Sequence, residues 1–200
     1  MKKVATIFTA TIVACSLLAD TATAEDDWID GEFKVAGGGI LSMSYPEYWG
    51  KKPERNANET ITDLKFGPYG PRSKPVFMVR VTTIQTGIHT EDPDILTIIR
   101  DDVDQLSGTA AESKIAVHGF EGPDMKGLYF SMTDRESKHG EFDYLTMAVI
   151  HSNRLLIKCY FLSSDGAPDY GADAMEMMRS LKYTPPPPEE DKKKKKKRRS

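Results

Sequence analysis

Two apolar segments near the C-terminal end of the chain constrain its fold most. They are FDYLTMAVIH at 142–151 and RLLIKCYFLS at 154–163. In the second segment Leu155, Ile157, Cys159 and Phe161 fall on one face of an extended strand, because successive side chains of a strand point to opposite faces. The two segments meet around Ser152 and Asn153, which indicates a hairpin and therefore an antiparallel sheet.

Other segments have strand or helix character. The sequence predicts strands that begin in 38–49 (ended by Pro46) and in 63–74, and further strands in 75–84, 114–120 and 125–135. It predicts a helix over 91–108, with Asp92 as its cap, Pro93 at its first position and Gly108 after its end. A second amphipathic helix is expected over 167–183. The order of elements predicts an α+β fold, in which an antiparallel β-sheet is covered by helices.

The inward faces of both helices are apolar. In the first helix these residues are Ile95, Ile98, Ile99, Val103 and Leu106, and in the second they are Tyr170, Ala174, Met177, Met178 and Leu181.

The N-terminal segment is typical of a signal peptide. Lys2 and Lys3 precede an apolar stretch that is short for a bilayer span, and Ala22-Thr23-Ala24 is a small-x-small cleavage site. We expect residues 1–24 to be removed and the protein to be exported, as a periplasmic or secreted protein. An alternative stays open, because Ile12-Val13-Ala14-Cys15 is similar to a lipobox and would make Cys15 a lipidated first residue.

Cys159 is the only cysteine that remains after removal of residues 1–24, so no disulfide within the chain is possible. It lies in an apolar strand, where a buried and unreactive thiol is expected. Residues 25–184, the predicted single domain, must therefore be stabilised by their apolar core.

The last segment, residues 185–200, is predicted to be a disordered tail rich in Pro and Lys. Four prolines and three acidic residues precede eight consecutive basic ones. The basic residues are Lys192, Lys193, Lys194, Lys195, Lys196, Lys197, Arg198 and Arg199. In an exported protein such a run has the chemistry to contact anionic membranes or wall polymers nonspecifically.

The remainder of the chain is acidic. Residues 25–188 contain 17 basic and 26 acidic residues, a net charge of −9. Nucleic-acid-binding domains carry a basic face, so no nucleic-acid partner is expected. The opposite charges also allow the tail to fold back on its own domain or on a neighbouring copy.

The sequence shows no motif for catalysis, a cofactor or a metal, and we assign no catalytic, cofactor-binding or metal-binding residue. His89 stands beside Glu91, Asp92 and Asp94, but acidic residues are common at a helix N-terminus. His118, His139 and His151 are expected at strand ends or turns, and Glu141 and Asp143 near His139 form too common a pattern to indicate a catalytic pair. Tyr45, Tyr48 and Trp49 are interpreted as an apolar plug under the sheet, with an aromatic binding lip as the alternative.

Two short motifs are similar to those of a known family. Ser-Tyr-Pro-Glu-Tyr-Trp at 44–49 and Met-Arg-Ser-Leu-Lys-Tyr at 178–183, together with the order of elements over 33–183, resemble the PsbP/Mog1-type sandwich. The resemblance implies a sheet covered by helices and a role in binding or assembly.

The expected function is an exported, non-enzymatic binding or assembly module with a protein partner in the cell envelope. An enzyme with a site of unfamiliar type, or a lipid-anchored lipoprotein of the same fold, are the alternatives. A pocket with two convergent titratable groups would favour the enzyme.

Overall fold

A computed structural model describes residues 27–35, 38–55, 61–68, 77–85, 94–122, 125–138, 141–152, 155–164 and 170–187. The predicted signal peptide (1–24) and the basic run of the tail lie outside these ranges. In the described part of the chain, neither helix has the length and apolar character that a membrane crossing requires.

Ten strands and two helices make up the described fold. The strands are β1 (Trp28–Lys34), β2 (Ile40–Pro46), β3 (Gly50–Arg55), β4 (Ile61–Gly67), β5 (Phe77–Gln85), β6 (His118–Glu121), β7 (Lys126–Thr133), β8 (Tyr144–Ser152), β9 (Leu155–Ser163) and β10 (Lys182–Thr184), and the helices are α1 (Ile95–Leu106) and α2 (Tyr170–Ser180).

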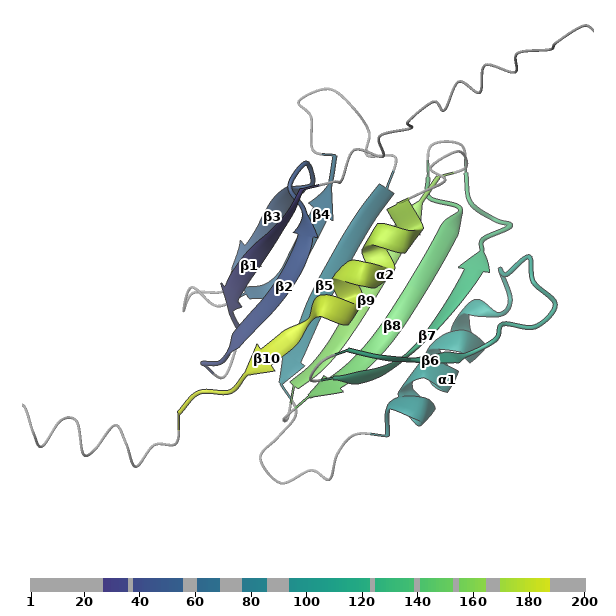
Figure 1. Cartoon of the computed structure of the whole chain (residues 1–200). Helices are drawn as coiled ribbons and strands as arrows, with labels where there is room; N and C mark the ends of the chain where they lie inside the picture. The colour runs from purple at the N-terminus through teal and green to yellow at the C-terminus, as the bar shows by residue number, and fades with distance from the viewer. Residues whose placement is uncertain are drawn as a thin grey trace, which may run out of the picture.

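Seven of these strands form one antiparallel sheet in the order β3-β4-β5-β9-β8-β7-β6. A smaller antiparallel sheet has the order β1-β2-β10. Figure 1 shows the small sheet and α2 in front of the large sheet, with α1 behind β7 and β8. The predicted α+β fold with helices over an antiparallel sheet is confirmed.

The predicted hairpin is the centre of the large sheet. Strands β8 and β9 pair from Ser152↔Leu155 to Tyr144↔Ser163 without a register shift. Leu155, Ile157, Cys159 and Phe161 are buried on the face toward α2, as their alternation predicts. Burial raises the pKa of the Cys159 thiol above its ordinary value, which leaves it in the unreactive protonated form.

Both faces of the large sheet are buried, each by different elements. On the face toward α2, Ala148 and Ile150 of β8 pack with the small sheet and the helix. On the opposite face Met147 and Val149 pack under Ile99 of α1. The helices therefore lie on opposite faces of the sheet.

The first helix starts later than the sequence predicts. Its N-cap is Asp94, whose Oδ1 accepts the N–H groups of Leu96 at 3.0 Å and Thr97 at 3.3 Å. The cap expected at Asp92 lies outside the described residues, and Pro93 precedes the cap instead of opening the helix. The hydrogen bonds of Asp94, including one from the Thr97 hydroxyl, lower the pKa of its carboxyl group.

The second helix ends earlier than predicted. It stops at Ser180, and residues 182–184 form β10 on the edge of β2, with Tyr183 opposite Leu41. Sequence reasoning also missed β1 and β3, and the strand predicted at 114–120 begins only at His118, as β6 (His118–Glu121). Ile115 and Val117 nevertheless pack against the core under α1.

We expect Cys159 to react slowly with thiol reagents in the native protein and fast after unfolding. The Cys159→Ser variant should lose about 1–3 kcal/mol of unfolding free energy, because it buries a hydroxyl in an apolar strand. Time-resolved labelling with a chromogenic disulfide and denaturant titration measure the two effects. Fast labelling of the native protein would contradict the buried position.

Candidate functional site

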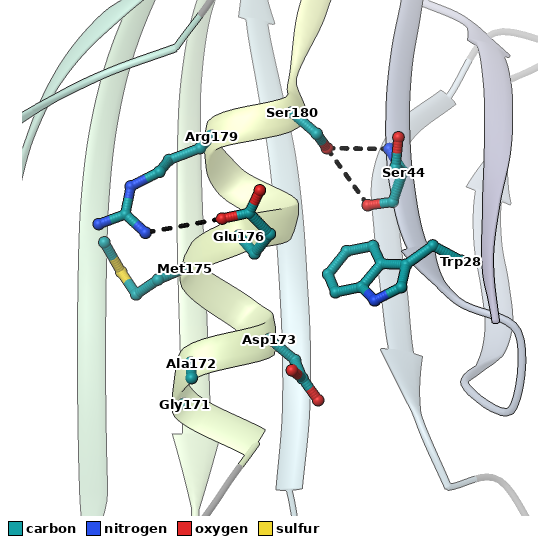
Figure 2. A pocket seen from close by; sticks show the side chains of 9 residues that line it. All are labelled: Trp28, Ser44, Gly171, Ala172, Asp173, Met175, Glu176, Arg179 and Ser180. Carbon is teal, nitrogen blue, oxygen red and sulfur yellow. Dashed lines mark hydrogen bonds and ion pairs between the residues drawn. The ribbon is translucent and has the colours of Figure 1, made fainter. Parts of the chain in front are cut away.

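A groove of about 850 Å³ runs along α2, between this helix and the outer surface of the small sheet. Figure 2 shows Trp28 and Ser44 on the strands beside α2, Asp173 and Ser180 on the side of the helix toward them, and Ala172, Met175 and Arg179 on its other side. The residues that line the groove are Trp28, Ser44, Gly171, Ala172, Asp173, Met175, Glu176, Arg179 and Ser180.

Strand and helix periodicity explain why these residues face the groove. In β2, Met43 and Tyr45 point into the core, so Ser44 between them points outward. On α2, Ala172, Met175, Glu176 and Arg179 follow a spacing of three and four residues and form one face. The opposite face of the helix carries the buried Ala174, Met177 and Met178. The groove is therefore the outer seam between two elements whose inner sides belong to the core.

A short network holds this seam together. The Ser44 N–H donates to Ser180 Oγ at 2.9 Å, and the Ser180 hydroxyl donates to the Met177 carbonyl at 2.7 Å, with the Ser44 carbonyl at 3.2 Å as the alternative acceptor. Ser44 Oγ in turn donates to Asp30 Oδ1 at 2.6 Å. These bonds join β1, β2 and the end of α2, so they fix the width of the groove at that end.

The aromatic residues at 45–49 are divided between core and surface. Tyr45 and Trp49 are buried, with Tyr45 beside Phe66 and Trp49 beside Phe77, which confirms the predicted plug for these two. Tyr48 is 50% exposed, and its hydroxyl donates to Asp173 Oδ2 at 3.4 Å. Tyr48 is thus a lip residue at the N-terminal end of α2, and the plug interpretation is wrong for it.

Carboxylates dominate the surroundings of the groove. Asp173 and Glu176 line it, Asp30 is bonded to its Ser44, and Glu32 lies two residues along the same face of β1. Arg179 is the one cationic lining residue, and its guanidinium lies 3.9 Å from Glu176. The groove therefore has a negative rim.

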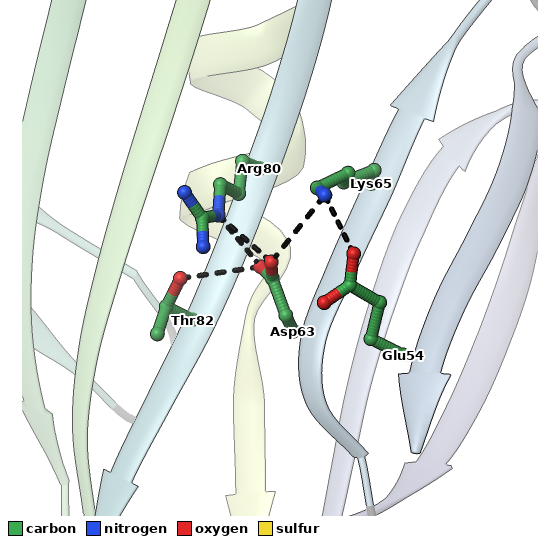
Figure 3. A network of polar contacts seen from close by, with 5 residues as sticks. All are labelled: Glu54, Asp63, Lys65, Arg80 and Thr82. Carbon is green, nitrogen blue, oxygen red and sulfur yellow. Dashed lines mark hydrogen bonds and ion pairs between the residues drawn. The ribbon is translucent and has the colours of Figure 1, made fainter.

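A second polar cluster lies on the other face of the large sheet (Figure 3). Asp63 of β4 is only 4% exposed, and both of its carboxylate oxygens accept Arg80 Nε, at 2.8 and 3.0 Å. Thr82 Oγ1 donates to it at 3.2 Å, and Lys65 Nζ lies 3.8 Å from Asp63 and 2.6 Å from Glu54. The hydrogen bond to Asp63 raises the pKa of the Arg80 guanidinium. Positive and negative groups balance here, so we interpret the cluster as structural.

The residues considered from the sequence as ligands do not form a site. Asp94 is the cap of α1, while His89, Glu91, Asp92 and His139 lie outside the described residues. His118 packs beside Tyr129, and Glu141 Oε2 accepts the backbone N–H of Lys138. Among the residues that the structure describes, no three His, Cys, Asp or Glu side chains come together in a way that fits a metal ion.

No family model and no curated protein matches the sequence. Solved structures do. Cyanobacterial PsbP (CyanoP) from Synechocystis sp. PCC 6803 superimposes with a TM-score of 0.52 at 10% identity, over 84% of this chain and 99% of that one. The chain has the PsbP/Mog1-like fold. LpqN, described as involved in cell envelope biogenesis of Mycobacterium tuberculosis, gives a TM-score of 0.50 at 14% identity over 79% and 92% of the two chains.

A Bacteroides thetaiotaomicron VPI-5482 protein also matches, with a TM-score of 0.39 and 13% identity. The match covers 72% of this chain and 45% of that longer protein. The likeness to CyanoP and LpqN confirms the predicted resemblance to the PsbP/Mog1-type sandwich at the level of the fold.

The Asp63→Ala variant should lose about 1–3 kcal/mol of unfolding free energy, because it removes charge-assisted hydrogen bonds to Arg80 in a protected position. Glu54→Ala is the matched control. It removes an exposed partner of Lys65 and should cost at most about 1 kcal/mol. Denaturant titration of both variants measures the difference, and equal losses would contradict the structural role of Asp63.

Proposed function

We propose that this chain is an exported, non-enzymatic binding or assembly module of the cell envelope, which docks a partner in the groove along α2. The observation that carries this proposal is the form of the groove. It is an open seam between a helix and a sheet edge, lined by an indole, a thioether, small residues and an ion pair. Such a surface suits a segment of another protein better than a small substrate that must be enclosed.

Two further observations support the envelope setting. The sequence of residues 1–24 is typical of a signal peptide. The fold is shared with LpqN, a protein described as involved in cell envelope biogenesis, and we extend that setting to this chain as part of the proposal.

The basic run 192–199 has a separate role in the proposal. It contacts anionic lipid or wall polymer and keeps the acidic domain near that surface. Each Lys or Arg close to an anionic membrane contributes about 1 kcal/mol, so eight charges supply a strong attraction to such a surface.

The proposal is tested by photo-crosslinking in envelope extract. A crosslinker placed at Ala172, in the groove, should capture a defined partner, whereas one placed at Gln105, on the exposed face of α1, should not. Replacing Met175 by Lys should abolish the capture without unfolding the protein. A catalytic activity of the purified protein that is lost on substitution of groove residues would establish the enzyme alternative instead.

The exported protein should begin at Glu25. Its intact mass after secretion measures this directly, because cleavage after Ala24 removes a defined set of residues. A species that begins at Cys15 and carries lipid would show that the lipoprotein alternative is correct.

Deletion of residues 189–200 should nearly abolish binding to vesicles that contain anionic lipid. Binding of the full chain should fall steeply as salt rises toward about 0.5 M, where the screening length is only a few ångströms. Vesicle co-sedimentation measures both effects. Neutral vesicles are the control, and a truncated chain that binds anionic vesicles as well as the full chain would contradict this role of the tail.

A further inference from the structure

The groove and the basic run are complementary in charge. Asp173 and Glu176 line the groove and Asp30 is bonded to its Ser44, while the only basic lining residue, Arg179, lies close to Glu176. The run Lys192–Arg199 carries eight positive charges. A negative rim attracts a cationic segment and repels an anionic one, so charge alone selects the kind of occupant.

Two aromatic rings lie beside carboxylates of the groove, where they can contact a cationic side chain. Trp28 is only partly buried, and its indole lies beside Ser44 on the sheet side of the groove (Figure 2). Tyr48, half exposed, lies at the end of the groove beside Asp173. A Lys or Arg over an aromatic face, with a carboxylate nearby, is attracted by both the ring and the negative charge. Two such contacts, at Trp28 and Tyr48, give the groove a weak affinity for cationic side chains.

The basic run is within reach of the groove of its own chain. The described residues end at Pro187, and Pro186 lies next to Gly38 at the turn between β1 and β2. Ser44 is six residues from Gly38 along the chain, about 20 Å at the rise of a strand. Six extended residues beyond Pro187 span about 20 Å and twelve span about 40 Å. The Ser180 end of the groove is thus within the fully extended length of the chain to Lys193, and the Tyr170 end, about 16 Å further along α2, is within that to Arg199.

We propose that Lys192–Arg199 docks in the groove of its own chain and competes there with the partner. A tethered segment has an effective concentration in the millimolar range, so even a weak contact is occupied for much of the time. The same charges cannot lie in the groove and on an anionic surface at once. Contact with such a surface then opens the groove to its partner, a coupling that rests on the proposed function.

Docking is measured by acrylamide quenching of tryptophan fluorescence. The protein has two tryptophans, and Trp49 is 2% exposed, so a neutral quencher reports mainly on Trp28. At low salt the full chain should be quenched less than the chain without residues 189–200. The difference should vanish at about 0.5 M salt, where the charges are screened. It should also vanish in the Trp28→Phe variant.

A peptide with the sequence of Lys192–Arg199, added to the truncated chain, should restore the protection of Trp28. A peptide with eight glutamates in the same positions should not. The difference in acrylamide quenching between the full and the truncated chain should be independent of protein concentration. A dependence on concentration would assign the groove to the tail of a second copy, and quenching that is the same for both chains, with no effect of the peptide, would overturn the proposal.

Charge variants connect docking to the surface. Asp173→Asn with Glu176→Gln should remove the protection of Trp28 and raise the affinity of the full chain for anionic vesicles. The gain is about two-fold if the run is docked half of the time. Asp101→Asn with Asp104→Asn, two exposed acids of α1 on the other face of the sheet, is the matched control and should leave the protection of Trp28 intact.

The two proposals fail in different ways. Loss of vesicle binding on truncation together with unchanged quenching would leave the surface role of the tail intact and remove its docking in the groove. Protection of Trp28 in a chain that does not bind vesicles would leave the docking in the groove intact and remove the surface role of the tail.

Discussion

The structure depends on covering both faces of its central strands β5, β9 and β8. These strands place apolar side chains on the face toward α2 and, along β8 and β9, on the opposite face as well. With one cysteine left after the predicted signal peptide, apolar burial has to provide the stability, at roughly 25 cal/mol for each Å² removed from water. Helix α1 covers one face, while α2 and the small sheet together cover the other. The positions of α1, α2 and the small sheet follow from this requirement.

The seam between α2 and the small sheet is a consequence of sharing one face between two unlike elements. A helix and a sheet have different thicknesses, so a groove remains between their outer surfaces where they pack side by side. The chain bridges them at one end, where Ser180 bonds to Ser44 and the chain continues directly into β10. Toward Tyr170 the contact is made by side chains, because Tyr48, in the turn after β2, donates to Asp173 at 3.4 Å. The groove is thus built into the way the layer is assembled.

Sequence reasoning recovered the elements whose pattern is strong and local. The alternation in 155–161 predicted the buried face of β9, and the spacing in both helices predicted their inward sides. It failed where pairing with a distant segment determines whether residues form a strand or a helix. Strand β10 has only three residues, and Lys182 and Tyr183 continue the helical pattern of α2, yet pairing with β2 makes them a strand. The residues of β3, with two lysines, a proline, a glutamate and an arginine, carry no strand pattern at all. The groove likewise could not be predicted from the sequence, because Trp28 and α2 are far apart in the chain and neither carries a motif.

The composition of β3 has a consequence for the behaviour of the protein in solution. This strand forms one edge of the seven-stranded sheet, and within the described ranges it pairs only with β4. A long edge with free backbone groups invites a strand from another molecule, which leads to ordered aggregation. Here Lys51, Lys52, Glu54 and Arg55 are exposed, and Pro53 removes one backbone donor from the strand. Growth of the sheet from molecule to molecule, and with it the formation of β-fibres, is therefore discouraged at this edge.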